Sequence, residues 1–210
     1  MFLDELERDA MTELLNVAVS RSAVALSRMV GRPVSMSVPV VRMMPRAQAL
    51  AAIDGDRPSP LVAVGEQFSG PFSGSALLVF PEARSLRLVQ AIIGEQTSLE
   101  EIAELPGEAM TEVGNVILNS CLSGIANMLR CRIEATLPSC YQGTGEQIFK
   151  RTIRDGDESG ILIMSIDFNI RERDIGGYIV LLLDLNAISN LRHAIARYVA
   201  ELRDTASKGP

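Results

Sequence analysis

The motif Glu-x-x-Asn occurs twice in this sequence, as Glu13 with Asn16 and as Glu112 with Asn115. Residues three apart on an α-helix are neighbours, about 4.5 Å apart along its axis. Each motif therefore sets a carboxylate, which accepts hydrogen bonds, beside a neutral amide, which both donates and accepts them. A single pair of this kind is most often part of a solvated helix face. The repetition of the pair makes these four residues the candidate site of the chain.

Each pair belongs to a longer polar stripe and is followed by a proline at the same distance. Pro39 follows Asn16 by 23 positions, and Pro138 follows Asn115 by the same 23. The helix positions i, i+4, i+7 and i+11 share one face. They are Asp9, Glu13, Asn16 and Ser20 in the first stripe and Glu108, Glu112, Asn115 and Asn119 in the second. The pairs and prolines are related by an offset of 99 residues, which indicates an internal duplication. We expect both prolines at strand entries or sheet edges rather than in contact with a partner.

Other site chemistries find little support in the residue types. His193 is the one histidine, so a nucleophilic hydrolase has no candidate base outside a predicted terminal helix. We expect Cys121, Cys131 and Cys140 to be buried thiols, because no CxxC motif or histidine cluster gives them metal-ligand spacing. The chain is therefore expected to bind no metal or cofactor.

The composition predicts a globular protein of the cytoplasm. Hydrophobic residues make up 47% of the 210 residues and charged residues 22%, which excludes a disordered chain. The net charge of −6 offers no basic surplus for a nucleic-acid backbone. The acidic N-terminal residues do not resemble a secretion signal, and the longest apolar run is far shorter than the ~20 residues that span a bilayer. We expect a protein that binds neither nucleic acid nor membrane.

Hydrophobic periodicity predicts the same series of elements in both halves. Each half begins with a long helix (4–30 and 107–130), in which apolar residues recur every three or four positions. An alternating strand follows (33–41 and 132–140), then a hairpin (61–67 with 75–80, and 161–170 with 178–183), and then a shorter helix (83–93 and 187–202). The predicted fold class is α/β, more narrowly α+β, built from two fused, pseudo-symmetric αβββα units.

A polar break at 94–98 predicts the boundary between the halves. The first repeat is predicted at 1–97 and the second at 98–204, within a single compact domain, and the tail 205–210 is expected to fray. A short helix is predicted to begin at Ser98 and to end before Pro106, and exposed loops are predicted at 54–60 and 155–160.

The stripe and its proline resemble the pattern [Asp/Ser]-x3-Glu-x2-Asn-x22-Pro of the CheC, CheX and FliY family of chemotaxis phosphatases. The first copy, from Asp9 to Pro39, fits in full. The second fits from Glu112 to Pro138, with Glu108 in place of the leading Asp or Ser. The segment EVGNVILNSCLSGIANMLRCRIEATLP is closest to the second motif helix of CheC. The family fold implies two long motif helices packed on an antiparallel sheet.

The resemblance implies a phosphatase that accelerates hydrolysis of the aspartyl phosphate on a CheY-like response regulator. Asn16 and Asn115 would orient the attacking water, since a neutral amide adds no negative charge beside the phosphoryl group. Glu13 and Glu112 would pair with a lysine of the regulator and fix the docking register. The regulator would supply the aspartyl phosphate and the Mg²⁺, and no covalent intermediate would form on this chain.

The first copy departs from the family at the residues that follow Asn16. Family members usually have glycines where this chain has Ala18 and Ser20, and Arg21 adds bulk and charge. If those glycines allow close approach of the regulator, the first site is weakened. The second copy is therefore predicted to carry the stronger pair.

Other interpretations stay open. The middle domains of flagellar switch proteins such as FliM resemble CheC but lack the Glu/Asn pairs and act as scaffolds, so the main alternative is a non-enzymatic scaffold or adaptor of the same fold. CheC proteins also bind the receptor deamidase CheD, which makes a CheD homologue a candidate partner. Internal duplication already supplies two-fold symmetry within one chain, which favours a monomer.

Overall fold

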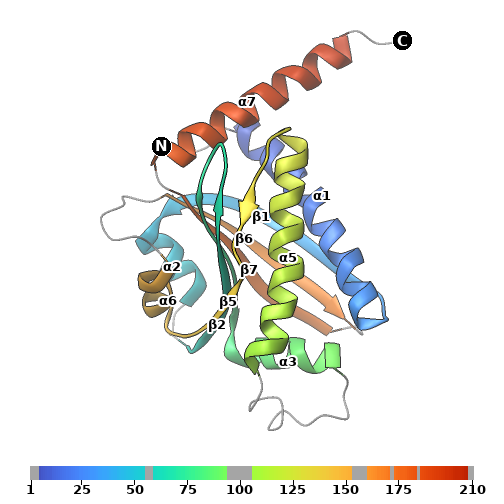
Figure 1. The fold of residues 1–210 in the computed structure, drawn as a ribbon, viewed down its shortest axis with the longest axis vertical. Coiled ribbons are helices and arrows are strands. Elements are labelled where there is room, and N and C mark those ends of the chain that lie inside the picture. Colours follow the sequence, from blue (N-terminus) through green and yellow to red (C-terminus); the bar gives the residue numbers. More distant parts are fainter. Residues whose placement is uncertain are drawn as a thin grey trace.

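The computed structural model describes residues 5–54, 59–93, 106–152, 160–170, 173–183 and 185–207. In the first half the elements are α1 (Glu5–Val30), β1 (Val34–Pro45), α2 (Arg46–Asp54), β2 (Leu61–Ser69), β3 (Gly74–Pro81) and α3 (Glu82–Ile93). In the second half they are α5 (Pro106–Met128), β4 (Glu134–Ala135), β5 (Ser139–Gly143), α6 (Gly145–Thr152), β6 (Gly160–Ile170), β7 (Arg173–Leu183) and α7 (Leu185–Ser207). Both halves thus pass through the same order of elements, except that β4 and β5 of the second half stand where the first half has β1 (Figure 1).

The strands form one antiparallel sheet in the order β1-β6-β7-β3-β2-β4, with β5 also paired to β2. The two predicted hairpins are present, β2 with β3 and β6 with β7. At the centre β3 pairs with β7, with Leu78 opposite Ile179, and joins the halves. At the edges β1 pairs with β6 of the second half, while β4 and β5 pair with β2 of the first. The two halves therefore exchange their first strands.

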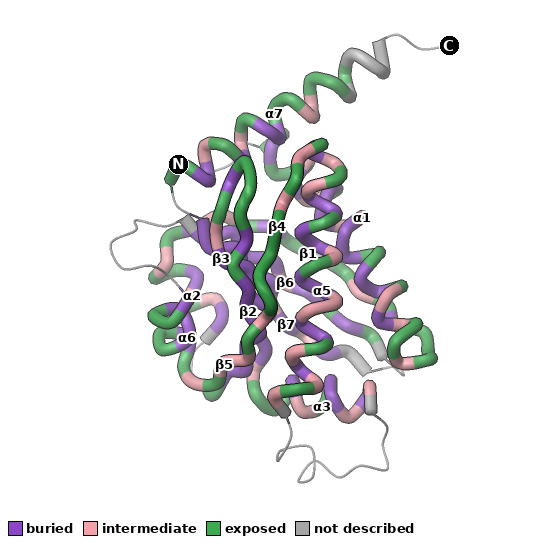
Figure 2. Tube along the Cα trace, viewed as in Figure 1, coloured by how far each residue is buried: buried purple, intermediate pink, exposed green. Residues whose placement is uncertain are grey.

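The sheet separates two hydrophobic cores (Figures 1 and 2). Residues of α1, α3, α5 and α7 enclose the larger core on one face, and residues of α2 and α6 enclose the smaller core on the other. Successive side chains of a strand point to opposite faces. In β3, Leu78 and Phe80 therefore enter the larger core, while Leu77 and Val79 enter the smaller one. Burial on both faces explains why the central strands are almost continuously apolar in sequence.

The helices α1 and α5 pack against each other at duplicated positions. Ser22 and Cys121 are 99 residues apart, the same offset that relates the motifs, and the Ser22 Oγ lies 4.0 Å from the Cys121 Sγ. Nearby, a Cβ added to Gly124 would collide with Ala18, so a glycine is needed for the helices to approach this closely. The crossing therefore relates the two motif helices by a pseudo-two-fold axis.

Two features of the fold differ from the sequence prediction. The short helices α2 and α6 were not predicted, because helices of two turns depend on packing against the rest of the protein. The predicted strand at 132–140 is wrong at its start and in its middle, since residues 132–133 precede β4 and residues 136–138 separate β4 from β5. There the N–H of Thr136 donates to the backbone carbonyl of Gln67, and the Oγ1 of Thr136 accepts from the backbone N–H of Gln67. Pro138 has no N–H with which to continue the ladder.

Several predicted boundaries fall on residues outside the described part of the chain. These include the break at 94–98, the whole of the short helix predicted from Ser98, and most of the loops at 54–60 and 155–160. The division into repeats at 97 and 98 therefore stays a prediction. Helix α7 continues through Ser207, so it includes the first three residues of the predicted tail 205–210. None of the described helices is long and apolar enough to cross a membrane.

Candidate functional site

The first Glu–Asn pair lies on the outer side of α1. Leu14, Leu15 and Ala18 are fully buried in the protein body. Glu13, directly before them in the sequence, is exposed, and Asn16, between Leu15 and Ala18, is half-buried. The helical period of 3.6 residues thus separates the core residues from the polar pair. Because the opposite face of the helix is packed in the core, the backbone beneath the pair is held in place.

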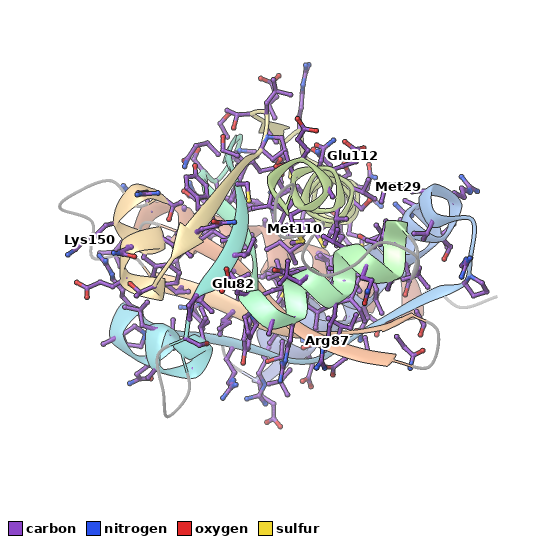
Figure 3. The ribbon with its side chains drawn as sticks, turned by 90° about the horizontal axis from the view of Figure 1, so that it is seen from below. Met29, Glu82, Arg87, Met110, Glu112 and Lys150 are labelled. Atoms are coloured by element: carbon purple, nitrogen blue, oxygen red, sulfur yellow. The ribbon has the colours of Figure 1, made fainter. Side chains whose placement is uncertain are left out.

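The second pair has the equivalent position on α5. Met110, Val113 and Ile117 are buried, whereas Glu112 is exposed and Asn115 is half-buried. Figure 3 shows Met110 on the side of α5 that faces the sheet and Glu112 on the opposite side. The structure therefore places all four predicted site residues on the outward faces of two helices that pack against each other.

An open groove of about 530 Å³ lies along the first pair. It is lined by Glu13, Asn16, Val17, Ser20, Arg21 and Val24. Val24 is 53% exposed, so the groove offers apolar surface to a partner as well as an acid and a base. The residue equivalent to Val24 on α5 is Ser123, which is also exposed. The surroundings of the first pair are thus more apolar than those of the second.

The two asparagines also differ in their hydrogen bonds. On α5 the Nδ2 of Asn119 donates to the Oδ1 of Asn115 at 2.6 Å. At the matching place on α1, the Ser20 Oγ donates at 2.7 Å to the backbone carbonyl of Asn16 and not to its side chain. The side-chain amide of Asn115 is therefore restrained by its neighbour, and that of Asn16 is not restrained in this way. The sequence had placed both Asn119 and Ser20 on the stripes but gave no sign of this difference.

The departures from the family pattern after Asn16 fall on two different faces of α1. Ala18 is fully buried and faces Gly124 of α5. Ser20 and Arg21 are exposed and line the groove. The change at Ala18 therefore concerns the contact between the helices, and only Ser20 and Arg21 alter the surface that a partner would meet.

The acids that precede the pairs are exposed on the same helices. Asp9 lies four residues before Glu13, and Glu108 lies four residues before Glu112. Glu108 is in the first turn of α5, where a carboxylate interacts favourably with the helix dipole. Stabilisation of the helix start is therefore one sufficient reason for an acid at that position.

Both motif prolines lie where an edge strand is irregular. The register of β1 against β6 shifts between Ser37 and Val40, and Pro39 falls in this interval. Pro138 lies in the interval between β4 and β5 at the other edge of the sheet. Proline has no N–H to donate to a ladder and is tolerated at edges and bulges. A structural role at these breaks is enough to account for both residues.

A buried acid beneath α5 was missed by the sequence prediction. Glu66 in β2 is 3% exposed, and its carboxylate oxygens have no hydrogen-bond partner within the described residues. Burial raises the pKa of Glu66 from 4.5 to about 7. Burial also raises the pKa of Cys121 to about 12, and the charge of Glu66 adds to this shift, so the two groups are near each other. The sequence did contain a signal of this buried acid, because Glu66 is the single acid in the apolar run of β2.

The cysteines agree only partly with the expectation of buried thiols. Cys121 is buried, whereas Cys131 and Cys140 are half-buried, and all three are free thiols. Burial raises the pKa of Cys131 and of Cys140 as well. In the part of the chain that the structure describes, no group of three His, Cys, Asp or Glu side chains is arranged to hold a metal ion.

Known relatives of the chain are chemotaxis and flagellar proteins. No family model matches it. The flagellar motor switch phosphatase FliY of Bacillus subtilis (strain 168) is 28% identical over 173 residues, which cover 80% of this chain and 43% of FliY. The CheC1 protein of Halobacterium salinarum is 20% identical over 123 residues, which cover 58% of this chain and 63% of CheC1. The chain thus spans less than two-thirds of the length of either relative.

Solved structures share the fold at low sequence identity. The crystal structure of Thermotoga maritima FliY matches with a TM-score of 0.75 at 20% identity, covering 94% of this chain and all of that one. CheX of Desulfovibrio desulfuricans matches with a TM-score of 0.53 at 18% identity, covering 80% of this chain and 99% of that one. The predicted α/β fold class is confirmed. The predicted resemblance is confirmed as well, because the relatives FliY and CheC1 and the structural neighbours FliY and CheX are members of the CheC, CheX and FliY family.

Proposed function

We propose that this chain is a phosphatase of a CheY-like response regulator, with one site on α1 and another on α5. The observation that carries the proposal is the outward placement of two equivalent Glu–Asn pairs on packed helices. The names of the relatives support it, since FliY is a flagellar motor switch phosphatase and CheC1 is described as a candidate CheY-P phosphatase. CheX of Borrelia burgdorferi, with a TM-score of 0.50, has been solved in complex with CheY, BeF3 and Mg²⁺.

In the proposed mechanism the regulator provides the aspartyl phosphate and the Mg²⁺, and this chain positions the water. Asn16 or Asn115 hydrogen-bonds the water and holds it in line with the scissile P–O bond. Glu13 or Glu112, exposed nearly one turn earlier, pairs with a lysine of the regulator. Phosphoryl transfer depends mainly on positioning and electrostatics, so a site without a nucleophile on this chain is chemically sufficient.

The test is the decay of an acyl-phosphorylated CheY-like regulator from the same organism in the presence of Mg²⁺. We expect wild type to accelerate decay and the double variant Asn16→Ala, Asn115→Ala to abolish the acceleration. Asn127→Ala is the matched control, because Asn127 is an exposed asparagine on α5 outside the motif. Complete loss with Asn115→Ala alone would mean that only the second site works.

A scaffold or adaptor is the second candidate, and structural neighbours favour it. The FliM middle domain of Vibrio alginolyticus matches with a TM-score of 0.58, and FliM in the FliM–SpeE complex of Helicobacter pylori matches with 0.64. A chain that binds the regulator without shortening the lifetime of its phosphate, with or without a CheD homologue, would replace the phosphatase proposal with this one.

Three further properties stay proposals. Binding of a CheD homologue is tested by co-purification, and the monomeric state by light scattering after size-exclusion chromatography. The cytoplasmic location is tested by cell fractionation.

A further inference from the structure

The hydrogen bond between Asn119 and Asn115 joins two outward-facing side chains of the second site. Its donor–acceptor distance is 2.6 Å, and the i, i+4 spacing places the two side chains on one face. Asn119 is exposed and Asn115 is half-buried. Within the described residues, no other protein group bonds to the side-chain amide of Asn115.

This bond decides which end of the Asn115 amide is available to a water molecule. Because Oδ1 accepts from Asn119, the two Nδ2 hydrogens of Asn115 point away from Asn119 and are free to donate. A water that accepts from Nδ2 keeps a lone pair for attack on phosphorus. One lone pair of Oδ1 also remains to accept a hydrogen bond. The amide is thus held in a single orientation before any partner arrives.

We propose that Asn119 is a positioning residue of the second site, which acts by holding the Asn115 amide in the orientation that receives the attacking water. This rests on the proposed function of Asn115. Without the bond, the Asn115 side chain keeps its rotational freedom in the docked complex and must lose it each time it holds the attacking water in the transition state. That cost slows the chemical step and leaves the affinity for the regulator unchanged.

The first site lacks this restraint. Ser20 occupies the position equivalent to Asn119, and its hydroxyl bonds to the backbone carbonyl of Asn16. A serine side chain is also too short to replace the amide of Asn119 while it makes that bond. The first site therefore turns over more slowly than the second when a regulator is bound.

A purely structural role for Asn119 predicts a different outcome. The bond is exposed to solvent, where water competes for both partners, so it contributes little to folding. Alanine also has a higher helix propensity than asparagine. Asn119→Ala is therefore expected to leave the melting temperature unchanged or slightly raised. A loss of turnover without a loss of stability separates positioning from folding.

The kinetic test uses an Asn16→Ala background, in which only the second site works. Asn119→Ala should lower kcat about tenfold and leave KM unchanged. Asn119→Gln keeps the amide donor and should recover most of the lost kcat, whereas Asn119→Asp can only accept and should not. Asn127→Ala is the matched control and should have no effect. An unchanged kcat for Asn119→Ala, or a change in KM alone, would overturn the proposal.

The reciprocal test installs the restraint at the first site. In an Asn115→Ala background, Ser20→Asn should raise kcat severalfold, because its amide can bond to the side chain of Asn16 as Asn119 does to Asn115. A lower or unchanged kcat, with the fold intact by circular dichroism, would count against the positioning role.

A measurement that needs no activity separates this proposal from the proposed function. In ¹⁵N-labelled wild type, NMR relaxation should show the side-chain amide of Asn115 more ordered than that of Asn16, and Asn119→Ala should remove the difference. An ordered Asn115 in a protein without phosphatase activity would refute the function and leave the restraint established. A mobile Asn115 in an active protein would refute the restraint and leave the function standing.

Discussion

The helices α1 and α5 carry the same Glu–Asn pair at the same distance from their crossing, but they are supported differently. On α1, Leu14 and Leu15 directly precede Asn16, and both side chains are fully buried in the core. The position equivalent to Leu15 on α5 is Gly114, where an added Cβ would collide with Val64 of β2. The backbone of α5 therefore lies directly on the sheet beside Asn115. On α1, the side chain of Leu15 lies between the backbone and the rest of the core.

The outer surfaces of the two helices differ as well. The groove on α1 exposes Arg21 and Val24, whereas α5 has Ser120 and Ser123 at the equivalent positions. The restrained amide is found on α5 only. Under the proposed function, the first site has more surface with which to hold a regulator, and the second has the better-ordered asparagine. Duplicated sites can thus keep one motif and differ in affinity and in turnover.

The largest effect is expected from disrupting the crossing of α1 and α5, which both sites share. Gly124→Val places a branched side chain against Ala18 and should destabilise the protein by about 3 kcal/mol, since neither backbone can move freely. Urea unfolding measures the stability, and regulator-phosphate decay in single-site backgrounds should show that both sites lose activity. Gly107→Ala is the control, because an added Cβ there meets nothing within 4 Å. Loss at one site only would contradict the shared crossing.

The next expected effect is a pH dependence of the stability, which arises from Glu66 in the strand beneath α5. Glu66 in β2 and Ile166 in β6 are matching positions, because each precedes a buried phenylalanine by two residues. Folding raises the pKa of Glu66 from 4.5 to about 7, so the folded chain keeps a proton that the unfolded chain releases. This contribution to stability is fully present below pH 4.5 and is lost as pH rises through 7. It amounts to at most about 3 kcal/mol, because a difference of one pKa unit corresponds to about 1.4 kcal/mol.

Glu66→Gln removes that titration. The variant should be more stable than wild type above pH 7 and no more stable below pH 4.5, as measured by urea midpoints across this range. Glu134→Gln is the matched control, since Glu134 is an exposed acid at the edge of the same sheet. A constant difference between Glu66→Gln and wild type at every pH would show that burial of the carboxyl is not the cause.

A smaller effect should fall on the second site alone. Gly114→Ala forces α5 away from Val64, a stiff branched residue, and should cost about 2 kcal/mol of stability. The displacement also moves the adjacent Asn115, so turnover should drop in an Asn16→Ala background and persist in an Asn115→Ala background. Equal losses in the two backgrounds would mean that the effect is one of global stability.

The smallest effect should fall on binding at the first site. Val24→Ser removes apolar surface from the groove and should raise KM about fivefold in an Asn115→Ala background, equivalent to about 1 kcal/mol of lost burial. The reciprocal change, Ser123→Val on α5, should not weaken the second site. An unchanged KM for Val24→Ser would show that the regulator does not touch this end of the groove.

The sequence by itself determined the elements that local patterns encode. The helical spacing of Leu14, Ala18 and the polar stripe defined α1 and its outward face, and the 99-residue offset revealed the duplication. The alternating and apolar runs defined both hairpins. These features follow from periods of 3.6 and 2 residues, which are read over a few turns or a few positions. The same logic placed all four Glu and Asn residues on helix surfaces.

The tertiary structure decided what depends on residues far apart in the chain. The exchange of β1 and β5 between halves, the contact of Ala18 with Gly124, and the burial of Glu66 beneath α5 each join distant segments. Even the Asn119–Asn115 bond, local in sequence, required side-chain rotamers that spacing does not give. Periodicity assigns a residue to a face of its own element. What packs against that face is settled by the fold as a whole, because burial and long-range pairing are properties of the assembled chain.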